Sequence, residues 1–236
     1  HEMIGSDGSM TVEFRCSAYR TNSPYYPIID HLEKHLKFGN EESPETKLER
    51  IESFLNDLSF PKEEVVPLMA SILGVPMLDR YPPLNQTPEQ KKRQIEALLI
   101  SWFLESAKRQ PILSIWEDMH WADPSTLGLL GQLLTHAARV RFFALMTHRL
   151  EFRHPWQNSS NLSQLFLNRF GRPQVASMVK QLTGGMDLPA AVLEQVSMKT
   201  DGVPLFVEEV TKLLLGSGHL QQKDGRYELT SPLPDL

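Results

Sequence analysis

Residues 112–126 read ILSIWEDMHWADPST, and this stretch decides more about the fold than any other part of the chain. A mostly apolar run, residues 112–116, passes directly into two adjacent carboxylates, Glu117 and Asp118. Asp123-Pro124 then has the form of a helix N-cap followed by proline at the first helical position. The stretch therefore predicts a buried strand that ends in acidic residues, a short loop and a helix.

Apolar strands and helical patterns alternate on both sides of this stretch. Strands are predicted at 11–16 and 140–147, with a weaker candidate at 164–168. The helices expected from caps, spacing and breakers cover 24–37, 44–58, 62–73, 87–109, 124–136, 173–183, 189–199 and 204–216. Residues 227–229 are expected to form the second arm of a small hairpin.

The order of these elements indicates the fold class. Ser23-Pro24 and Ser43-Pro44 each predict an N-cap with proline at N1, and residues 87–90 predict a capping box. Strands that alternate with helices are typical of an α/β fold, in which helices cover a parallel sheet on both faces. Residues 1–170 are expected to form this core, with a helical insertion at about 24–110, and residues 171–236 a helical lid subdomain.

Composition excludes several classes of protein. The formal net charge of −5 gives no basic footprint, so nucleic-acid binding is not expected. The longest strongly apolar stretch, residues 97–104, is too short to span a bilayer, and no signal peptide is visible. Cys16 is the single cysteine, so no intramolecular disulfide can form. The expected location is the cytoplasm.

Charged residues at the ends of two predicted strands suggest phosphate chemistry. Adjacent carboxylates on an extended chain point to opposite sides, so one of Glu117 and Asp118 can reach Mg²⁺ while the other reaches water or a neighbouring side chain. Arg149 closes the strand at 140–147, where a guanidinium suits a γ-phosphate. The alternatives are a solvated strand-to-loop turn for the carboxylates and a surface salt bridge with Glu151 for the arginine.

Three further sequence features bear on the function. Gly202-Val203-Pro204 opens an apolar helix, and it serves either as a plain helix start or as a turn that packs against a nucleotide base. His31 and His35 have zinc-ligand spacing, but no third ligand is evident, so surface histidines are expected. The chain contains no Gly-x-x-x-x-Gly-Lys-Ser/Thr loop to hold phosphates.

With these pieces in order, the chain resembles the AAA-like ATPase module of STAND-type signalling NTPases. The nearest likeness is to the module found beside adenylate/guanylate cyclase or kinase domains in large bacterial regulators. It covers nearly the whole chain, over the blocks 14–19, 22–29, 81–84, 117–126 and 199–209. The resemblance implies a P-loop NTPase-like, three-layer parallel sheet that lacks its first strand and phosphate loop, followed by a helical lid.

The resemblance also implies a role for each candidate residue. Glu117 and Asp118 match the Walker B position, for Mg²⁺ and for polarising water, although the family often has Asp first in the pair. Arg149 matches the sensor arginine that contacts the γ-phosphate. The matches expected to contact the cofactor are His120 and Trp121, a family signature, and Gly202 and Pro204, the turn that touches adenine from the lid.

The missing Walker A loop limits what the chain is expected to do alone. In this family that loop precedes the strand at 11–16, and its strand lies beside the strand at 140–147, so an apolar edge should be left unpaired. We expect the isolated chain to be poorly stable and not to bind ATP measurably. The intact protein is expected to be an ATP- and Mg²⁺-dependent switch for an attached or partner output domain, with oligomerisation possible.

Two other functions fit the same sequence. The first is a degenerate interaction scaffold that keeps the fold and does not hydrolyse ATP. The second is part of a STAND-type transcriptional regulator, which a helix-turn-helix downstream of Leu236 would indicate.

Overall fold

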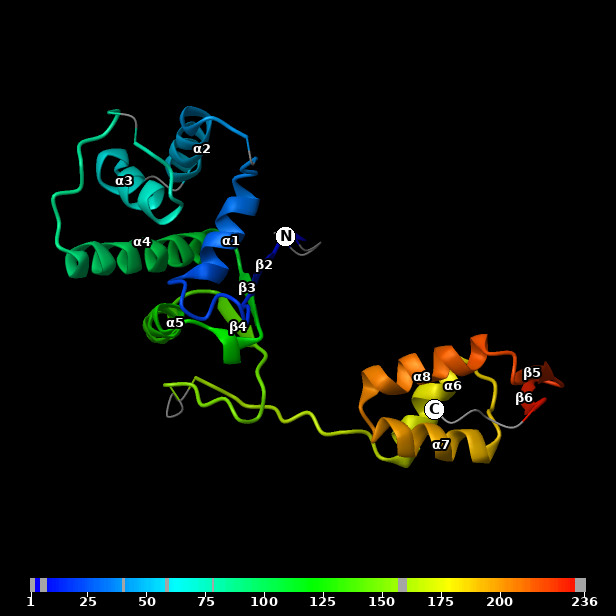
Figure 1. The fold of residues 1–236 in the computed structure, drawn as a ribbon. Helices are drawn as coiled ribbons and strands as arrows, with labels where there is room; N and C mark the ends of the chain where they lie inside the picture. Colours follow the sequence, from blue (N-terminus) through cyan, green and yellow to red (C-terminus); the bar gives the residue numbers. More distant parts are fainter. Residues whose placement is uncertain are drawn as a thin grey trace. The chain divides into compact units, whose positions relative to one another are not determined.

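A computed structural model describes residues 3–4, 8–39, 41–57, 60–77, 79–156 and 161–231. The chain divides into two compact units, His1–Leu162 and Ser163–Leu236, and each is described by itself. The first unit contains a four-stranded sheet in the order β1-β2-β3-β4 (Figure 1). Its strands are β1 (Met3–Ile4), β2 (Met10–Arg15), β3 (Ile112–Glu117) and β4 (Phe142–Met146).

The three longer strands are parallel, and β1 pairs antiparallel with β2 at one edge. The helices of this unit are α1 (Tyr26–His35), α2 (Pro44–Asp57), α3 (Lys62–Ile72), α4 (Pro88–Arg109) and α5 (Pro124–Ala137), with a 3-10 turn η1 (Met119–Trp121). Helices α1 to α4 form the predicted insertion between β2 and β3. The α/β class and the parallel sheet are therefore confirmed.

Alternate residues of each strand define two different sheet faces. One face carries the buried side chains of Val12 and Phe14 on β2 and of Trp116 on β3. The ring of Phe14 stacks on that of Trp116 at 4.1 Å, and Phe103 of α4 meets Phe142 of β4 edge-on at 6.1 Å. Helices α1, α4 and α5 lie on this side of the strands (Figure 1).

None of the described helices of the first unit covers the opposite face. It carries Leu113 and Ile115 on β3 and, in register beside them, Phe143 and Leu145 on β4. Phe143 is 65% exposed and Leu145 is 46% exposed. The sheet grows in one direction, from β2 to β3 to β4, and right-handed crossovers then place both connecting segments on the same face.

The second unit is a small helical body with a hairpin. Helices α6 (Arg172–Leu182), α7 (Ala190–Thr200) and α8 (Pro204–Gly216) enclose a core of mainly valine side chains. The hairpin joins β5 (Leu220–Lys223) to β6 (Arg226–Leu229) through Asp224 and Gly225, both with positive φ, as a two-residue hairpin turn requires. The predicted helices and hairpin are confirmed here.

Three local predictions are wrong. The helix predicted from Ser23-Pro24 begins at Tyr26, because the chain first makes turns in which the N–H groups of Ser23 and Tyr26 donate to carbonyls three residues earlier. Residues 164–168 form no strand, since they pair with no strand of the described chain. His31 is buried against Phe14 and not on the surface, because its face of α1 packs on β2.

Candidate functional site

The candidate site lies where β3 and β4 end side by side. Backbone hydrogen bonds hold the two strand ends together: the N–H of Thr147 donates to the carbonyl of Trp116 at 2.9 Å, and the N–H of Met119 donates to the carbonyl of Thr147 at 2.9 Å. The N–H of Asp118 donates to the Thr147 hydroxyl at 3.1 Å. The carboxyl edge of a parallel sheet is where α/β proteins bind their ligands.

Asp118 turns the chain sharply at this edge. Its backbone is left-handed, with φ 57° and ψ 42°, a conformation that aspartate tolerates better than most residues. Its half-buried carboxylate makes no hydrogen bond or ion pair with any residue in the described part of the chain. The Asp118 side chain is thus available for a cation or a polar ligand.

Glu117, in contrast, is already occupied. Arg15 lies beside it in the parallel register of β2 and β3, and its Nε donates to Glu117 Oε2 at 2.7 Å, with a second bond from its terminal nitrogen. The hydrogen bond to Glu117 is the main reason that the pKa of Arg15 is raised. The adjacent carboxylates therefore diverge as expected, and Asp118 is the one without a partner.

Arg149 lies close to Trp121. Its guanidinium carbon is 5.5 Å from the centre of the Trp121 ring, a cation–π contact. The alternative salt bridge with Glu151 does not form, although the structure describes both residues. Because a ring face attracts the cation without using its N–H groups, the donors of Arg149 remain free for an anion.

His120 lies in the same cluster, with its ring against that of Trp121. Its ring lies 4.4 Å from that of Trp121, and neither ring nitrogen has a hydrogen-bond partner or access to solvent in the described structure. Burial lowers the pKa of His120, and the positive charge of Arg149 lowers it further. Trp121 thus contacts both His120 and Arg149, so the rings of His120 and Trp121 connect the end of β3 to the Arg149 guanidinium.

Sequence reasoning missed an aromatic extension of this cluster after β4. His148 lies 5.4 Å from Phe152 and 6.1 Å from His154, whose ring is 5.7 Å from that of Trp156. Burial, followed by the charge of His148, lowers the pKa of His154. The signal was present in the sequence, since rings stand at positions 148, 152, 154 and 156.

Asp123 serves the architecture of the site. It is 2% exposed, and its Oδ1 accepts from the backbone N–H groups of Ser125 and Thr126, both at 3.0 Å, as the predicted N-cap of α5. The same oxygen accepts from the N–H of Tyr25 at 3.2 Å, which fixes the loop that precedes α1. Hydrogen bonding alone therefore explains the aspartate at position 123.

Gly202 and Pro204 belong to the second unit. Gly202 is buried with φ +68°, and a Cβ added to it would lie 2.1 Å from the carbonyl oxygen of Phe170. The N–H of Phe170 donates to the carbonyl of Gly202 at 2.7 Å. Backbone packing therefore accounts for Gly202, while Pro204 is exposed and begins α8.

The residues present suit magnesium better than a metal held by the protein alone. Within the described ranges, no group of three or more His, Cys, Asp or Glu side chains could hold a metal ion, His31 and His35 included. Magnesium is commonly bound by one or two carboxylates together with substrate phosphates, and Asp118 supplies such a carboxylate.

Among the described helices, none combines the length and apolar character needed to cross a bilayer.

Comparisons with known proteins leave the family open. No protein-family model matches the chain, and no solved structure matches it significantly. The chain is similar to the "Uncharacterized protein R02095" of Rhizobium meliloti (strain 1021), with 24% identity over 128 residues. That match covers 53% of this chain and 12% of the relative, so the chain spans only a small part of the relative's length.

Proposed function

We propose that the chain is part of an ATP-binding and ATP-hydrolysing switch module in a multidomain signalling protein. The observation that carries this proposal is the carboxylate of Asp118, which has no partner among the described residues and directly follows the middle parallel strand, while Arg149 follows the neighbouring strand and contacts Trp121. A nucleoside triphosphate with its Mg²⁺ requires a carboxylate oxygen for the metal and a cationic side chain for the phosphate, and this sheet edge carries both.

Each residue of the cluster has a part in the proposal. Asp118 holds Mg²⁺, directly or through water, and Arg149 contacts the γ-phosphate. Trp121 positions the Arg149 guanidinium through the cation–π contact, and the His120 ring packs against Trp121. Bound Mg²⁺ would neutralise phosphate charge, and Glu117 would orient the attacking water after release from Arg15.

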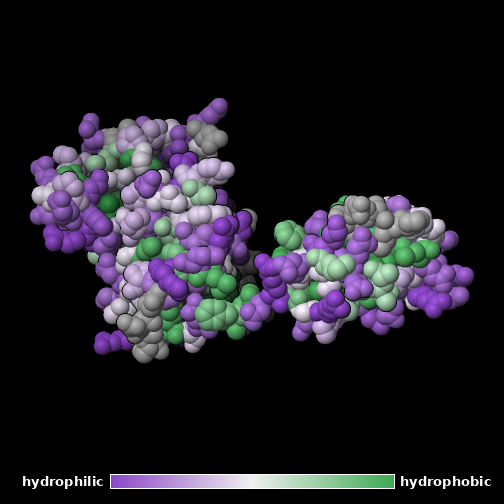
Figure 2. Space-filling model, turned by 60° about the horizontal axis from the view of Figure 1, so that its bottom comes forward, coloured by the Kyte–Doolittle hydropathy of each residue, from purple (hydrophilic) through white to green (hydrophobic). Residues whose placement is uncertain are grey.

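The exposed apolar surface of β4 supports the presence of an additional strand and helix beside it in the intact protein. β4 has no strand on its outer side among the described residues, and Phe143 and Leu145 are exposed on its open face. Apolar residues are exposed on the first unit in Figure 2. An added parallel strand beside β4, followed by a helix over Leu113 and Ile115, would bury this surface. The loop between them would lie beside Asp118, where a helix N-terminus binds phosphate.

The attached output domain is proposed to be a cyclase, a kinase or a regulator, on the resemblance alone. Nucleotide occupancy would change the conformation of the module and so change the output.

A second candidate is a scaffold of the same fold that does not hydrolyse ATP. The Arg15–Glu117 ion pair favours it, because this pair occupies the carboxylate that would otherwise activate water. The pair is largely exposed and so contributes little to stability, which leaves Glu117 free to change partners in a working enzyme. Turnover measurements therefore decide between the two candidates.

The experiment compares Asp118→Asn with Asp79→Asn in the intact protein. Both aspartates have a left-handed backbone that asparagine also tolerates, so the backbone is matched between the two variants. We expect Asp118→Asn to lower ATP turnover by about 10² or more, and Asp79→Asn to leave it unchanged. Calorimetry on the 236-residue chain alone is expected to show no ATP binding, because the chain has no phosphate-binding loop.

Three results would count against the proposal. Unchanged turnover in Asp118→Asn would remove Asp118 from the mechanism. ATP binding without turnover in the unaltered intact protein would favour the scaffold. Tight ATP binding by the isolated chain would show that the phosphate site does not require a further strand and loop.

A further inference from the structure

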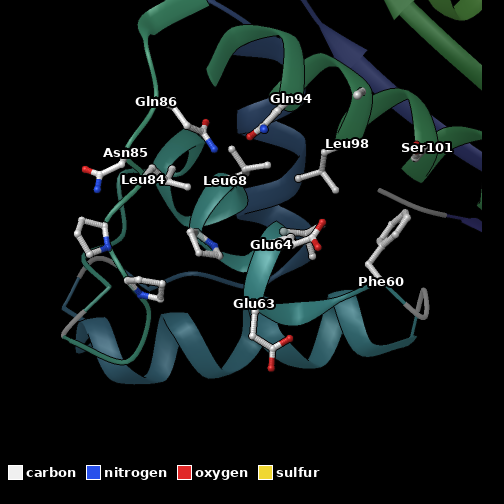
Figure 3. A pocket seen from close by; sticks show the side chains of 15 residues that line it. Phe60, Glu63, Glu64, Leu68, Leu84, Asn85, Gln86, Gln94, Leu98 and Ser101 are labelled. Atoms are coloured by element: carbon white, nitrogen blue, oxygen red, sulfur yellow. The ribbon is translucent and has the colours of Figure 1, made fainter. Parts of the chain in front are cut away.

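A cavity of about 510 Å³ opens on the helical insertion of the first unit and shares no residue with the site at the strand ends. It is bounded by α3, by α4 and by the Pro-rich loop 82–86 that precedes α4 (Figure 3). Its volume lies within the range of about 300–1,000 Å³ that is typical of sites for small molecules. The proposed ATPase mechanism makes no use of this space.

Apolar and polar groups are separated within the cavity. Leu68 and Leu98 lie between the amides of Gln86 and Gln94 at one end and the carboxylate of Glu64 at the other (Figure 3). The two leucines come from different helices, α3 and α4, so the apolar wall is a product of helix packing. A ligand that spans the cavity would have an apolar body with polar groups at its ends.

The charged end of the cavity is negative. Glu63 and Glu64 are its only charged lining residues, and neither carboxylate has a hydrogen-bond or ion-pair partner in the described part of the chain. Both stand in the first turn of α3, where the helix dipole favours negative charge. Two carboxylates without a cation at the mouth of an apolar cavity are complementary to a positively charged ligand.

The amide end adds a second preference. The side chains of Gln86 and Gln94 line this end, and an amide carries both a carbonyl oxygen and an N–H₂ group. A polar group of the ligand at this end can therefore donate or accept a hydrogen bond.

We propose that this cavity binds a small organic cation, a protonated amine carried on a ring-sized apolar body. The ammonium group pairs with Glu63 and Glu64, the apolar body packs against Leu68 and Leu98, and an N–H of the ring donates to an amide oxygen at the end lined by Gln86 and Gln94. The proposal is independent of ATP, so its failure and that of the ATPase proposal are distinguishable.

Tryptamine is the probe, because it combines an ammonium group, an apolar ring and a ring N–H. Calorimetric titration of the intact protein without nucleotide compares it with tryptophol, its neutral counterpart, and with indole-3-propionate, its anionic one. We expect saturable binding of tryptamine, weaker binding of tryptophol and none of indole-3-propionate. Equal binding of all three, or no saturable binding of tryptamine, would overturn the proposal.

Matched variants test the site itself. Glu63→Gln with Glu64→Gln should weaken tryptamine binding between about twofold and thirtyfold, as expected for two partly exposed charge pairs. Glu41→Gln with Glu49→Gln removes the same charge from exposed positions outside the cavity and should leave the affinity unchanged. Equal affinity in both double variants would refute the carboxylate contacts.

A filling variant gives an independent readout. Ala97 is an exposed lining residue on α4, so Ala97→Trp should occupy the cavity without disturbing the core and should abolish tryptamine binding. An unchanged thermal midpoint would show that this variant is folded, and retained binding would overturn the location of the site. The glutamine variants decide the question if Ala97→Trp does not fold.

Discussion

Replacing Asp123 with alanine removes four hydrogen bonds from one buried side chain. Its Oδ1 accepts from the N–H groups of Tyr25, Ser125 and Thr126, and its Oδ2 accepts from the Thr126 hydroxyl at 2.5 Å. Two of these bonds cap α5, one fixes the loop before α1, and one satisfies a hydroxyl that is fully buried. The variant therefore tests whether this aspartate organises the candidate site by hydrogen bonding.

The expected cost follows from these contacts. Loss of an N-cap costs about 1 kcal/mol, and each of the two other buried groups, the Tyr25 N–H and the Thr126 hydroxyl, costs about 1.5 kcal/mol when left unsatisfied. Asp123→Ala should thus lower the free energy of unfolding by about 4 kcal/mol, a large part of the roughly 5–15 kcal/mol that a domain has. Asp123→Asn keeps the Oδ1 acceptor and should cost only about 1 kcal/mol.

Urea denaturation followed by tryptophan fluorescence measures this loss. All four tryptophans, Trp102, Trp116, Trp121 and Trp156, lie in the first unit, so their emission reports its unfolding without a contribution from the second. Asp30→Ala, which removes only a surface pair with Lys34, serves as the control and should cost less than about 1 kcal/mol. A loss below about 1 kcal/mol in Asp123→Ala would refute the reasoning.

Two further predictions concern Gly202 and Cys16. Gly202→Ala places a Cβ against the Phe170 carbonyl at positive φ and should destabilise the second unit by about 3 kcal/mol or more, which faster amide exchange would report. Gly216→Ala adds its Cβ in open space on α8 and should leave the exchange rates unchanged. Equal exchange in the two variants would refute the packing argument. Burial raises the pKa of the Cys16 thiol from 9.0 to about 12, so the unfolded chain loses this proton first. The buried thiol contributes fully to the free energy of unfolding below about pH 9, and this contribution falls as the pH rises toward 12. In urea titrations between these pH values, the free energy of unfolding should therefore decline less steeply in Cys16→Ala than in the unaltered protein. Parallel pH profiles of the two proteins would contradict this prediction.

Local sequence signals predicted the elements well because the interactions that form them are local. The capping box at the start of α4 has both of its bonds, from the N–H of Gln90 to the Thr87 hydroxyl at 3.2 Å and from the N–H of Thr87 to the Gln90 amide at 2.9 Å. The strand at 112–117, the turn after it and the cap of α5 also follow from neighbours in sequence. The predictions that are wrong concern residues whose structure depends on contacts with segments distant in sequence.

Those failures have a common physical cause. Tyr25 takes a left-handed N-cap position in place of Ser23 because its N–H bonds to Asp123, 98 residues away. The segment 164–168 has strand-like composition, but a strand also needs a partner with free backbone groups, and none of the described segments supplies one. His31 is buried because the tertiary fold brings its ring against Phe14 and Trp102.

The sequence by itself determined that a strand runs into Glu117 and Asp118, that a capped helix follows, and that Arg149 comes soon after the next strand. Only the tertiary structure decided which carboxylate is free. The parallel register of β2 with β3 brings Arg15, 102 residues away, beside Glu117, while the left-handed turn leaves Asp118 without a partner. It also decided that the helices of the first unit lie on one face of the sheet, because their side depends on the direction in which strands are added and not on the pattern of any one segment.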